Sequence, residues 1–126
     1  AASNLPYDAN LVECCRPTLE GGSQGAAVLF KRCPDIDAFM TFNDLAAVGV
    51  LGTCHEMGRQ VPEEVSIIGF DDIPLARIVR PQLSTVHVNL AEIGGLAMQA
   101  LLTNLAGGEK YPDYMIEPGL ILRGSA

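Results

Sequence analysis

No long hydrophobic run is present in this sequence: none of its apolar stretches approaches the ~20 residues with which a helix crosses a bilayer. The first residues, AASNLPYDANL, also lack the basic segment and apolar stretch of a secretory leader. Hydrophobic residues nevertheless make up 48% of the 126 residues, which is enough to build the core of one domain. We therefore expect a soluble, cytoplasmic protein with no membrane partner.

Basic residues are few. Eight Lys and Arg residues face fifteen Asp and Glu residues, which gives a formal net charge of -7. The basic residues are also scattered along the chain, whereas a domain that grips a nucleic-acid backbone needs them clustered on one face. We expect that this chain does not bind DNA by itself.

The cysteines form no recognised metal or redox motif. They stand at positions 14, 15, 33 and 54, without a CxxC pair and without a histidine at zinc-ligand spacing. Most lie in apolar stretches, where a free cysteine packs as a small buried hydrophobe. We expect free thiols in a reducing compartment, with no metal and no cofactor.

Catalytic constellations are also absent. His55 and His87 have no cysteine or acid placed beside them to form a dyad, and no serine stands in a G-x-S-x-G turn. Gly21-Gly22 with Gly25 lacks the Lys-Ser/Thr pair of a phosphate-binding P-loop. We expect no enzyme, although an enzyme on a similar sheet is not excluded by fold alone.

The first part of the chain alternates strand and helix patterns. Leu11–Cys15 is short and β-leaning, and Gly21-Gly22 is expected to break the chain after it. Ser23–Cys33 carries apolar residues at spacings of three and four, which predicts a helix that ends at Pro34-Asp35. Ile36–Phe42 then reads as a buried strand.

The alternation continues through the middle of the chain. Asn43 can cap a helix that stops at Gly58, a residue suited to a helix C-terminus. Val65–Phe70 is apolar throughout, as a parallel strand between two helix layers must be. An acidic, proline-containing loop follows, and Leu83–Val88 is the next strand.

The last helix and the tail complete the pattern. Asn89 and Glu92 are spaced as in a capping box at the start of a helix. The expected buried face of that helix is Leu90, Ile93, Ala97, Leu101 and Leu105. Met115–Arg123 reads as one or two short strands, at a sheet edge or broken by Pro118. The order predicts an α/β fold: a mostly parallel sheet with helices on both faces.

Polar residues follow two of the expected parallel strands. Asn43-Asp44 comes after one and Asp71-Asp72 after another. Ligands of open α/β sheets bind beyond the carboxyl ends of the strands, and a carboxylate with an amide suits a polyol, a sugar or the edge of a base. The alternative is that Asn43 and Asp72 only cap a helix and a turn; for Asp71 we favour ligand contact.

Three linked motifs appear in order along the chain. The first is PDIDAFMTFNDLAAVGVL; the second is VPEEVSIIGFDDIPLARIVRPQLSTVHVNLAEIGGLAMQALLTNL; the third is the closing Leu122-Arg123-Gly124-Ser125. Together they resemble the LacI/GalR family of bacterial transcriptional regulators from about Gly21 to the end. The resemblance implies a periplasmic-binding-protein-like fold of two α/β lobes with an effector in the cleft.

The resemblance also implies how this chain fits that fold. Residues 1–126 would be the C-terminal lobe of a sugar- or nucleoside-type effector domain, without the DNA-binding head and the N-terminal lobe. Asn43 and Asp71 would contact the effector. Glu20 is the third ligand-binding residue that the resemblance implies, because it lies five residues before Gly25, where members often place an aromatic that stacks on the ligand. An acid at this position is a departure from the pattern.

A dimer interface is the third implication of the resemblance. Family members dimerise side by side, through the helix that starts at Asn43 and the loop around Ile78 and Val79. These two apolar residues lie between Arg77 and Arg80, which suits an interface. A buried loop anchor explains them equally well.

Two functions from different classes share this fold. In a regulator, effector binding shifts the population of lobe arrangements and so changes the grip of a dimer on operator DNA, through the missing head. A secreted solute-binding protein of a sugar transporter is the alternative, and it would need a signal peptide upstream. The Gly-Phe-Asp-Asp run and the unpaired cysteines favour the regulator.

Overall fold

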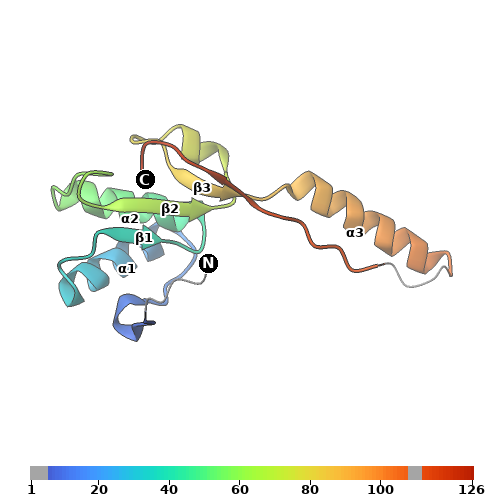
Figure 1. Ribbon diagram of the computed structural model, residues 1–126, viewed down its shortest axis with the longest axis horizontal. Coiled ribbons are helices and arrows are strands. Elements are labelled where there is room, and N and C mark those ends of the chain that lie inside the picture. Colours follow the sequence, from blue (N-terminus) through green and yellow to red (C-terminus); the bar gives the residue numbers. More distant parts are fainter. Residues whose placement is uncertain (1–5, 108–111) are drawn as a thin grey trace.

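The fold is a four-stranded sheet with two packed helices and a third helix that projects from it (Figure 1). A computed structural model describes residues 6–107 and 112–126. Its elements are η1 Ala9–Leu11, α1 Leu19–Arg32, β1 Ala38–Met40, α2 Asp44–Glu56, β2 Ser66–Phe70, η2 Pro74–Arg77, β3 Ser84–His87, α3 Leu90–Leu105 and β4 Gly119–Ile121. The strand order is β1-β2-β3-β4; β1, β2 and β3 are parallel, and β4 runs antiparallel to β3. The predicted mostly parallel α/β sheet is confirmed, and β4 lies at its edge.

The start of α1 differs from the prediction. Thr18 caps the helix, accepting a hydrogen bond from Gly21 N at 3.1 Å, so Gly21-Gly22 lies inside the helix and does not break the chain. The reason is the close crossing of α1 and α2. A Cβ on Gly22 would lie 2.1 Å from the Ala46 carbonyl oxygen, so only glycine allows this approach. The predicted end of the helix before Pro34 is confirmed.

Both predicted boundaries of α2 are confirmed. Asn43 has an extended backbone, and its Oδ1 accepts a hydrogen bond from Ala46 N at 2.9 Å, which satisfies one of the free amides of the first turn. Gly58 follows the helix with a φ of +71°, a left-handed conformation that glycine adopts without steric cost.

The strand predicted at Leu11–Cys15 is not formed. Residues 9–11 make a single 3₁₀ turn, and residues 12–17 belong to no strand. A strand needs a hydrogen-bonding partner, and here a hollow separates the segment from β1. The segment is held instead by an ion pair between Arg32 and Glu13, together with a bond from Arg32 Nη1 to the Asn10 carbonyl at 3.0 Å.

The core lies on one face of the sheet. It contains Ala26, Leu29, Phe30, Phe39, Ala47, Val50, Leu51, Cys54, Val65, Ile67, Ala76 and Leu83. α1 and α2 therefore cover the same face, which carries Phe39 and Ile67. Side chains alternate between the two faces along each strand, so Met40 and Leu120 lie on the opposite face. On that face Met40 is 78% exposed, and Leu120 is also exposed. No described helix packs on that second face, so the expected helices on both faces are not formed among the described residues; α3, the remaining helix, does not fold back onto the sheet.

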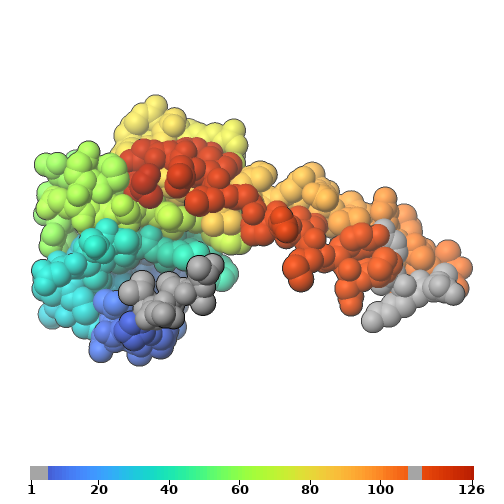
Figure 2. All heavy atoms as spheres, in the orientation of Figure 1, coloured from blue at the N-terminus to red at the C-terminus, as the bar shows by residue number. Residues whose placement is uncertain are grey.

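Helix α3 projects from the sheet, and the chain after residue 112 runs back beside it (Figures 1 and 2). Asn89 caps it, accepting from Glu92 N at 3.2 Å, as the capping pattern predicts. None of its residues is buried, so the predicted buried face is wrong for the described residues. The periodicity is present, but only the segment 112–116 lies against the helix, and no described helix or strand covers its apolar face. No described helix has the length and apolarity to span a membrane.

Candidate functional site

The carboxyl ends of β1 and β2 bring Asn43 and Asp71 to the same edge of the sheet. Met40 pairs with Ile68 in the parallel register. Asn43 and Asp71 each stand three residues beyond this pair, so the two polar residues follow neighbouring strands at the same level. The edge where ligands of open α/β sheets bind thus carries two of the three predicted contact residues, Asn43 and Asp71.

Asp71 presents an unpaired carboxylate at this edge. Its backbone φ is 107°, and its N–H donates to the Val86 carbonyl at 2.9 Å. Its side chain accepts no hydrogen bond from any residue in the ranges that the structure describes, although the residue is half-buried. Burial raises the pKa of this carboxyl, and the negative charge of Asp44 raises it further. A hydroxyl donor from a ligand would supply the missing partner.

Asp44 is the buried support of this loop. It has no exposed surface, and its Oδ1 accepts from the Thr85 hydroxyl at 2.6 Å. Its Oδ2 accepts from Ile73 N at 2.9 Å. Gly69 leaves room for the carboxylate, because a Cβ there would lie 2.1 Å from Oδ1. The site loop is therefore fastened to the start of α2 and to β3.

Asp72 binds three cationic or ionisable side chains. Its own side chain is 1% exposed, and it accepts from Arg123 Nη2 at 2.6 Å and from Arg77 Nη2 at 2.8 Å. His87 Nδ1 lies 3.2 Å from the same carboxylate. Burial alone would raise the pKa of Asp72, but hydrogen bonds and positive charge from Arg123 and Arg77 hold it below its usual value. Asp72 is thus a structural ion-pair residue, a role beyond the turn cap considered above.

Both the oxygen and the nitrogen of the Asn43 side-chain amide form hydrogen bonds within the chain. Besides capping α2, its Nδ2 donates to the Pro17 carbonyl at 3.1 Å. The capping interpretation is confirmed. One amide hydrogen and one oxygen lone pair remain for a ligand, so the predicted ligand contact stays a prediction.

Glu20 lies apart from the other two predicted contact residues. It is exposed in the first turn of α1, where its charge complements the helix dipole. It lines a hollow with Arg16 and Gln24, and neither Asn43 nor Asp71 lines that hollow. The structure therefore does not bring Glu20 to the edge that carries Asn43 and Asp71.

The two residues of the predicted dimer interface have different environments. Ile78 is 68% exposed, whereas Val79 is half-buried and packs against the core. Val79 therefore anchors the loop, and Ile78 alone presents apolar surface. Their role in a dimer stays a prediction.

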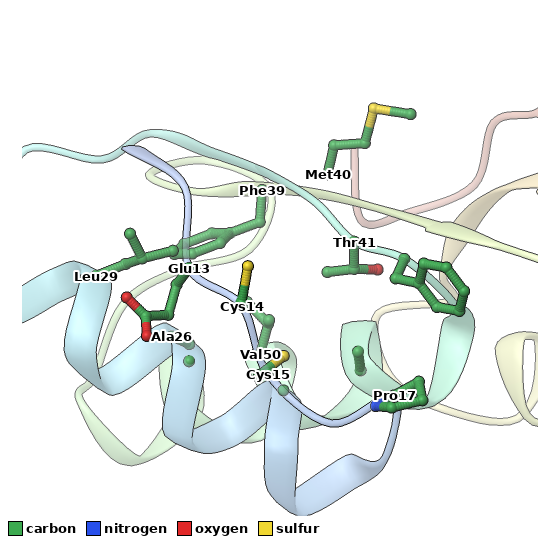
Figure 3. A pocket seen from close by; sticks show the side chains of 14 residues that line it. Glu13, Cys14, Cys15, Pro17, Ala26, Leu29, Phe39, Met40, Thr41 and Val50 are labelled. Carbon is green, nitrogen blue, oxygen red and sulfur yellow. The ribbon is translucent and has the colours of Figure 1, made fainter. Parts of the chain in front are cut away.

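An apolar hollow that the sequence did not reveal lies between β1 and the segment of residues 13–17 (Figure 3). Its volume is about 380 Å³, and its lining includes Pro17, Phe42 and Ala46. In Figure 3, Phe39 points toward Leu29 of α1, and Met40 points away from the helices. The sequence pattern placed Phe42 in a buried strand, but β1 ends at Met40 and Phe42 is exposed.

Comparison with known proteins identifies the family. All of residues 1–126 match the family described as periplasmic binding protein-like domain. GalR of Salmonella typhimurium is 35% identical over 99% of this chain and 37% of its own length. AscG of Escherichia coli is 36% identical over 99% of this chain and 37% of its own length.

Solved structures agree. The Escherichia coli repressor ascG superimposes with a TM-score of 0.88 at 32% identity, covering 98% of this chain and 45% of that one. The regulator CelR in complex with cellobiose gives a TM-score of 0.92 at 28% identity, covering 97% of this chain and 38% of that one. This chain spans less than half the length of each relative. It belongs to the periplasmic binding protein-like domain family, in the type found in LacI/GalR transcriptional regulators.

Proposed function

We propose that this chain is the effector-binding part of a bacterial LacI-type transcriptional regulator, that it acts in the cytoplasm, and that it binds a small polar ligand without catalysing a reaction. The observation that carries the proposal is the half-buried carboxylate of Asp71, which has no hydrogen-bond partner among residues 6–107 and 112–126 and lies at the same sheet edge as Asn43. A carboxylate can accept hydrogen bonds from two adjacent hydroxyls. The similar regulator solved in complex with cellobiose supports a sugar as the ligand class.

The exposed α3 supports a two-lobe organisation for the whole protein. The superposition on CelR covers 97% of this chain. The unmatched residues are fewer than the 16 residues of α3, so at least part of this helix superimposes on CelR. The position of the helix therefore recurs in a chain more than twice as long, although no described helix or strand covers it and only the segment 112–116 lies against it. We infer that further chain packs on α3, closes a ligand cleft and carries the operator-binding head. The two lobes would then respond to effector by a population shift.

A solute-binding protein of a transporter remains the second candidate. The relatives reported above are named as regulators or repressors, which favours the regulator. Operator binding by the native gene product, measured by gel shift on its own promoter, separates the two. Export of the native gene product from the cytoplasm, together with no binding to its promoter DNA, would contradict the regulator.

Replacing Asp71 with asparagine (Asp71→Asn) should weaken effector binding by about thirtyfold. Loss of a hydrogen bond to a charged group costs about 2 kcal/mol, which corresponds to that factor. Isothermal titration of the native gene product with a sugar panel that includes cellobiose and lactose measures the change. Glu63→Gln is the matched control, because Glu63 is an exposed acid in a turn remote from the site. Equal affinity of Asp71→Asn and wild type would rule out the proposed contact.

Replacing Ile78 with glutamate (Ile78→Glu) should dissociate the proposed homodimer, because it places a charge on exposed apolar surface within the loop. We expect the dissociation constant, measured by sedimentation equilibrium, to rise at least about tenfold. Val28→Glu, at an exposed position of α1, should leave it unchanged. An intact dimer in both variants would place the interface elsewhere.

A further inference from the structure

Cys14 and Cys15 are adjacent free thiols that the proposed function does not use. Both are exposed, Cys33 is half-buried, and Cys54 is buried. The packing expected from the apolar neighbours of the cysteines is therefore found for Cys54 alone. An exposed pair of thiols contributes little to the core, but it is accessible to compounds that react with sulfur.

The two thiols border the same hollow. Cys14 and Cys15 both line the apolar hollow between β1 and residues 13–17 (Figure 3). On the side of α1, Cys15 Sγ lies 3.5 Å from the position that a Cβ on Gly25 would take. Neither Asn43 nor Asp71 lines this hollow, so the thiol pair is separate from the edge that carries the proposed effector contacts.

The backbone that carries the pair is not held in a sheet. Residues 12–17 belong to no strand. Neither Cys14 nor Cys15 forms a backbone hydrogen bond with any residue in the parts of the chain that the structure describes. The residue before them is fixed, because Glu13 pairs with Arg32. The two thiols can therefore turn toward one another without breaking a backbone hydrogen bond.

The number and spacing of the thiols restrict what can bind them. Among residues 6–107 and 112–126, no group of three His, Cys, Asp or Glu side chains is placed to hold a metal ion, so a four-coordinate zinc site is not available there. Cα atoms joined by a trans peptide lie about 3.8 Å apart, whereas disulfides usually join Cα atoms about 4.4–6.8 Å apart. A direct bond between the two sulfurs is thus strained, and one atom inserted between them relieves the strain. The pair suits a sulfur-binding atom that needs only two thiols.

We propose that Cys14 and Cys15 form a dithiol site for trivalent arsenic that carries one organic group. Such a compound has two hydroxyls on arsenic, and each thiol replaces one of them. In each replacement an S–H bond and an As–O bond break, an As–S bond forms and one water molecule leaves. Arsenic stays trivalent, so no oxidant or reductant is required.

The hollow beside the thiols accommodates the organic group. Its volume is about 380 Å³, and Leu29, Phe39 and Val50 are among its apolar lining residues. Besides the two thiols, its polar lining side chains are Thr41 and Glu13, and Glu13 is already in an ion pair. A cavity of about 150 Å³ with apolar walls holds a benzene molecule, so a phenyl group on arsenic fits here.

The test is a titration of the native gene product with phenylarsine oxide, which hydrates to the dihydroxy form, in the presence of excess glutathione. Intact mass spectrometry counts the bound equivalents, and dithiothreitol should remove the equivalent held by the pair. Cys14→Ser and Cys15→Ser should each weaken binding at this site at least about hundredfold, because the second As–S bond is intramolecular only when both thiols are present.

Cys33→Ser is the matched control, because Cys33 is a free thiol with some exposed surface and no cysteine beside it. It should bind phenylarsine oxide as wild type does. Circular dichroism and thermal melting show whether each variant is folded, and Cys14→Ala and Cys15→Ala provide a second pair of variants. Inorganic arsenite has no organic group and should bind about tenfold more weakly than phenylarsine oxide, because only the phenyl group buries apolar surface in the hollow.

The outcomes distinguish this site from the proposed effector site. Wild-type affinity in a folded Cys14→Ser or Cys15→Ser variant overturns the dithiol site. Equal affinity for arsenite and phenylarsine oxide overturns the placement of the organic group in the hollow. Asp71→Asn should bind phenylarsine oxide as wild type does, and a loss in that variant would contradict the separation of the two sites.

Discussion

Replacing Gly49 with alanine (Gly49→Ala) is expected to destabilise the native gene product by about 3 kcal/mol, the upper end of what overpacking a core costs. A Cβ at this position would lie 2.1 Å from the Leu19 carbonyl oxygen and 2.7 Å from Ser23 N. Both are backbone atoms of α1, so the clash cannot be relieved by a side-chain rotation. The two helices would have to move apart and lose the bond between the Ser23 and Thr53 hydroxyls, 2.9 Å long. Urea unfolding followed by circular dichroism measures the change.

Gly52→Ala on the same helix provides the matched control. No atom lies within 4 Å of the Cβ position there, so only the intrinsic preference of alanine for helix acts. We expect a gain of about 0.5–1 kcal/mol in stability. A loss at Gly52 similar to that at Gly49 would contradict the helix-crossing explanation, because it would show that a methyl group added to α2 destabilises the protein even where no atom of α1 is near.

Features set by neighbouring residues were predicted from the sequence. The cap at Asn43, the left-handed Gly58 and the cap at Asn89 are all confirmed. Each depends on hydrogen bonds or sterics within a few residues, so the local pattern contains the necessary information. The strands that precede Asn43 and Asp71 were predicted for the same reason.

Features set by distant contacts were missed. Gly21-Gly22 resembles a chain break, but it lies inside α1 because α2 crosses there closely. Leu11–Cys15 has a strand pattern, but no described strand pairs with it. The periodicity of α3 predicted the right helix and the wrong burial, because a periodic face does not specify which element covers it.

The candidate site shows the same division. Asp71 and Asn43 were predicted as contacts because both follow expected strands. The pairing of Asp72 with Arg123, 51 residues along the chain, has no local signal. Neither does the full burial of Asp44, since the sequence indicates only a first-turn acid that complements a helix dipole.

Asp72 forms ion pairs with Arg123 and Arg77, and we expect the pair with Arg123 to contribute more to the free energy of unfolding. Arg123 is 11% exposed in its side chain, and Arg77, which binds the same carboxylate, is 62% exposed. Arg123→Met leaves the buried Asp72 charge without its close partner and should cost about 3 kcal/mol of unfolding free energy. Arg77→Met removes a solvent-screened pair and should cost about 0.5 kcal/mol. Urea unfolding at pH 7 compares the two variants.

Acid titration provides the second measurement of the same pair. The folded-state pKa of Asp72 is lowered from 3.8, so its contribution to stability is present above that value and is lost as pH falls through the folded pKa. Wild type should therefore lose stability steadily below about pH 4, as the unfolded chain takes up its proton first. Arg123→Met should lose less over the same interval, because the Asp72 pKa then moves back toward its ordinary value. An unchanged acid slope in Arg123→Met, or equal losses for the two arginine variants at pH 7, would show that exposure does not determine which partner stabilises Asp72.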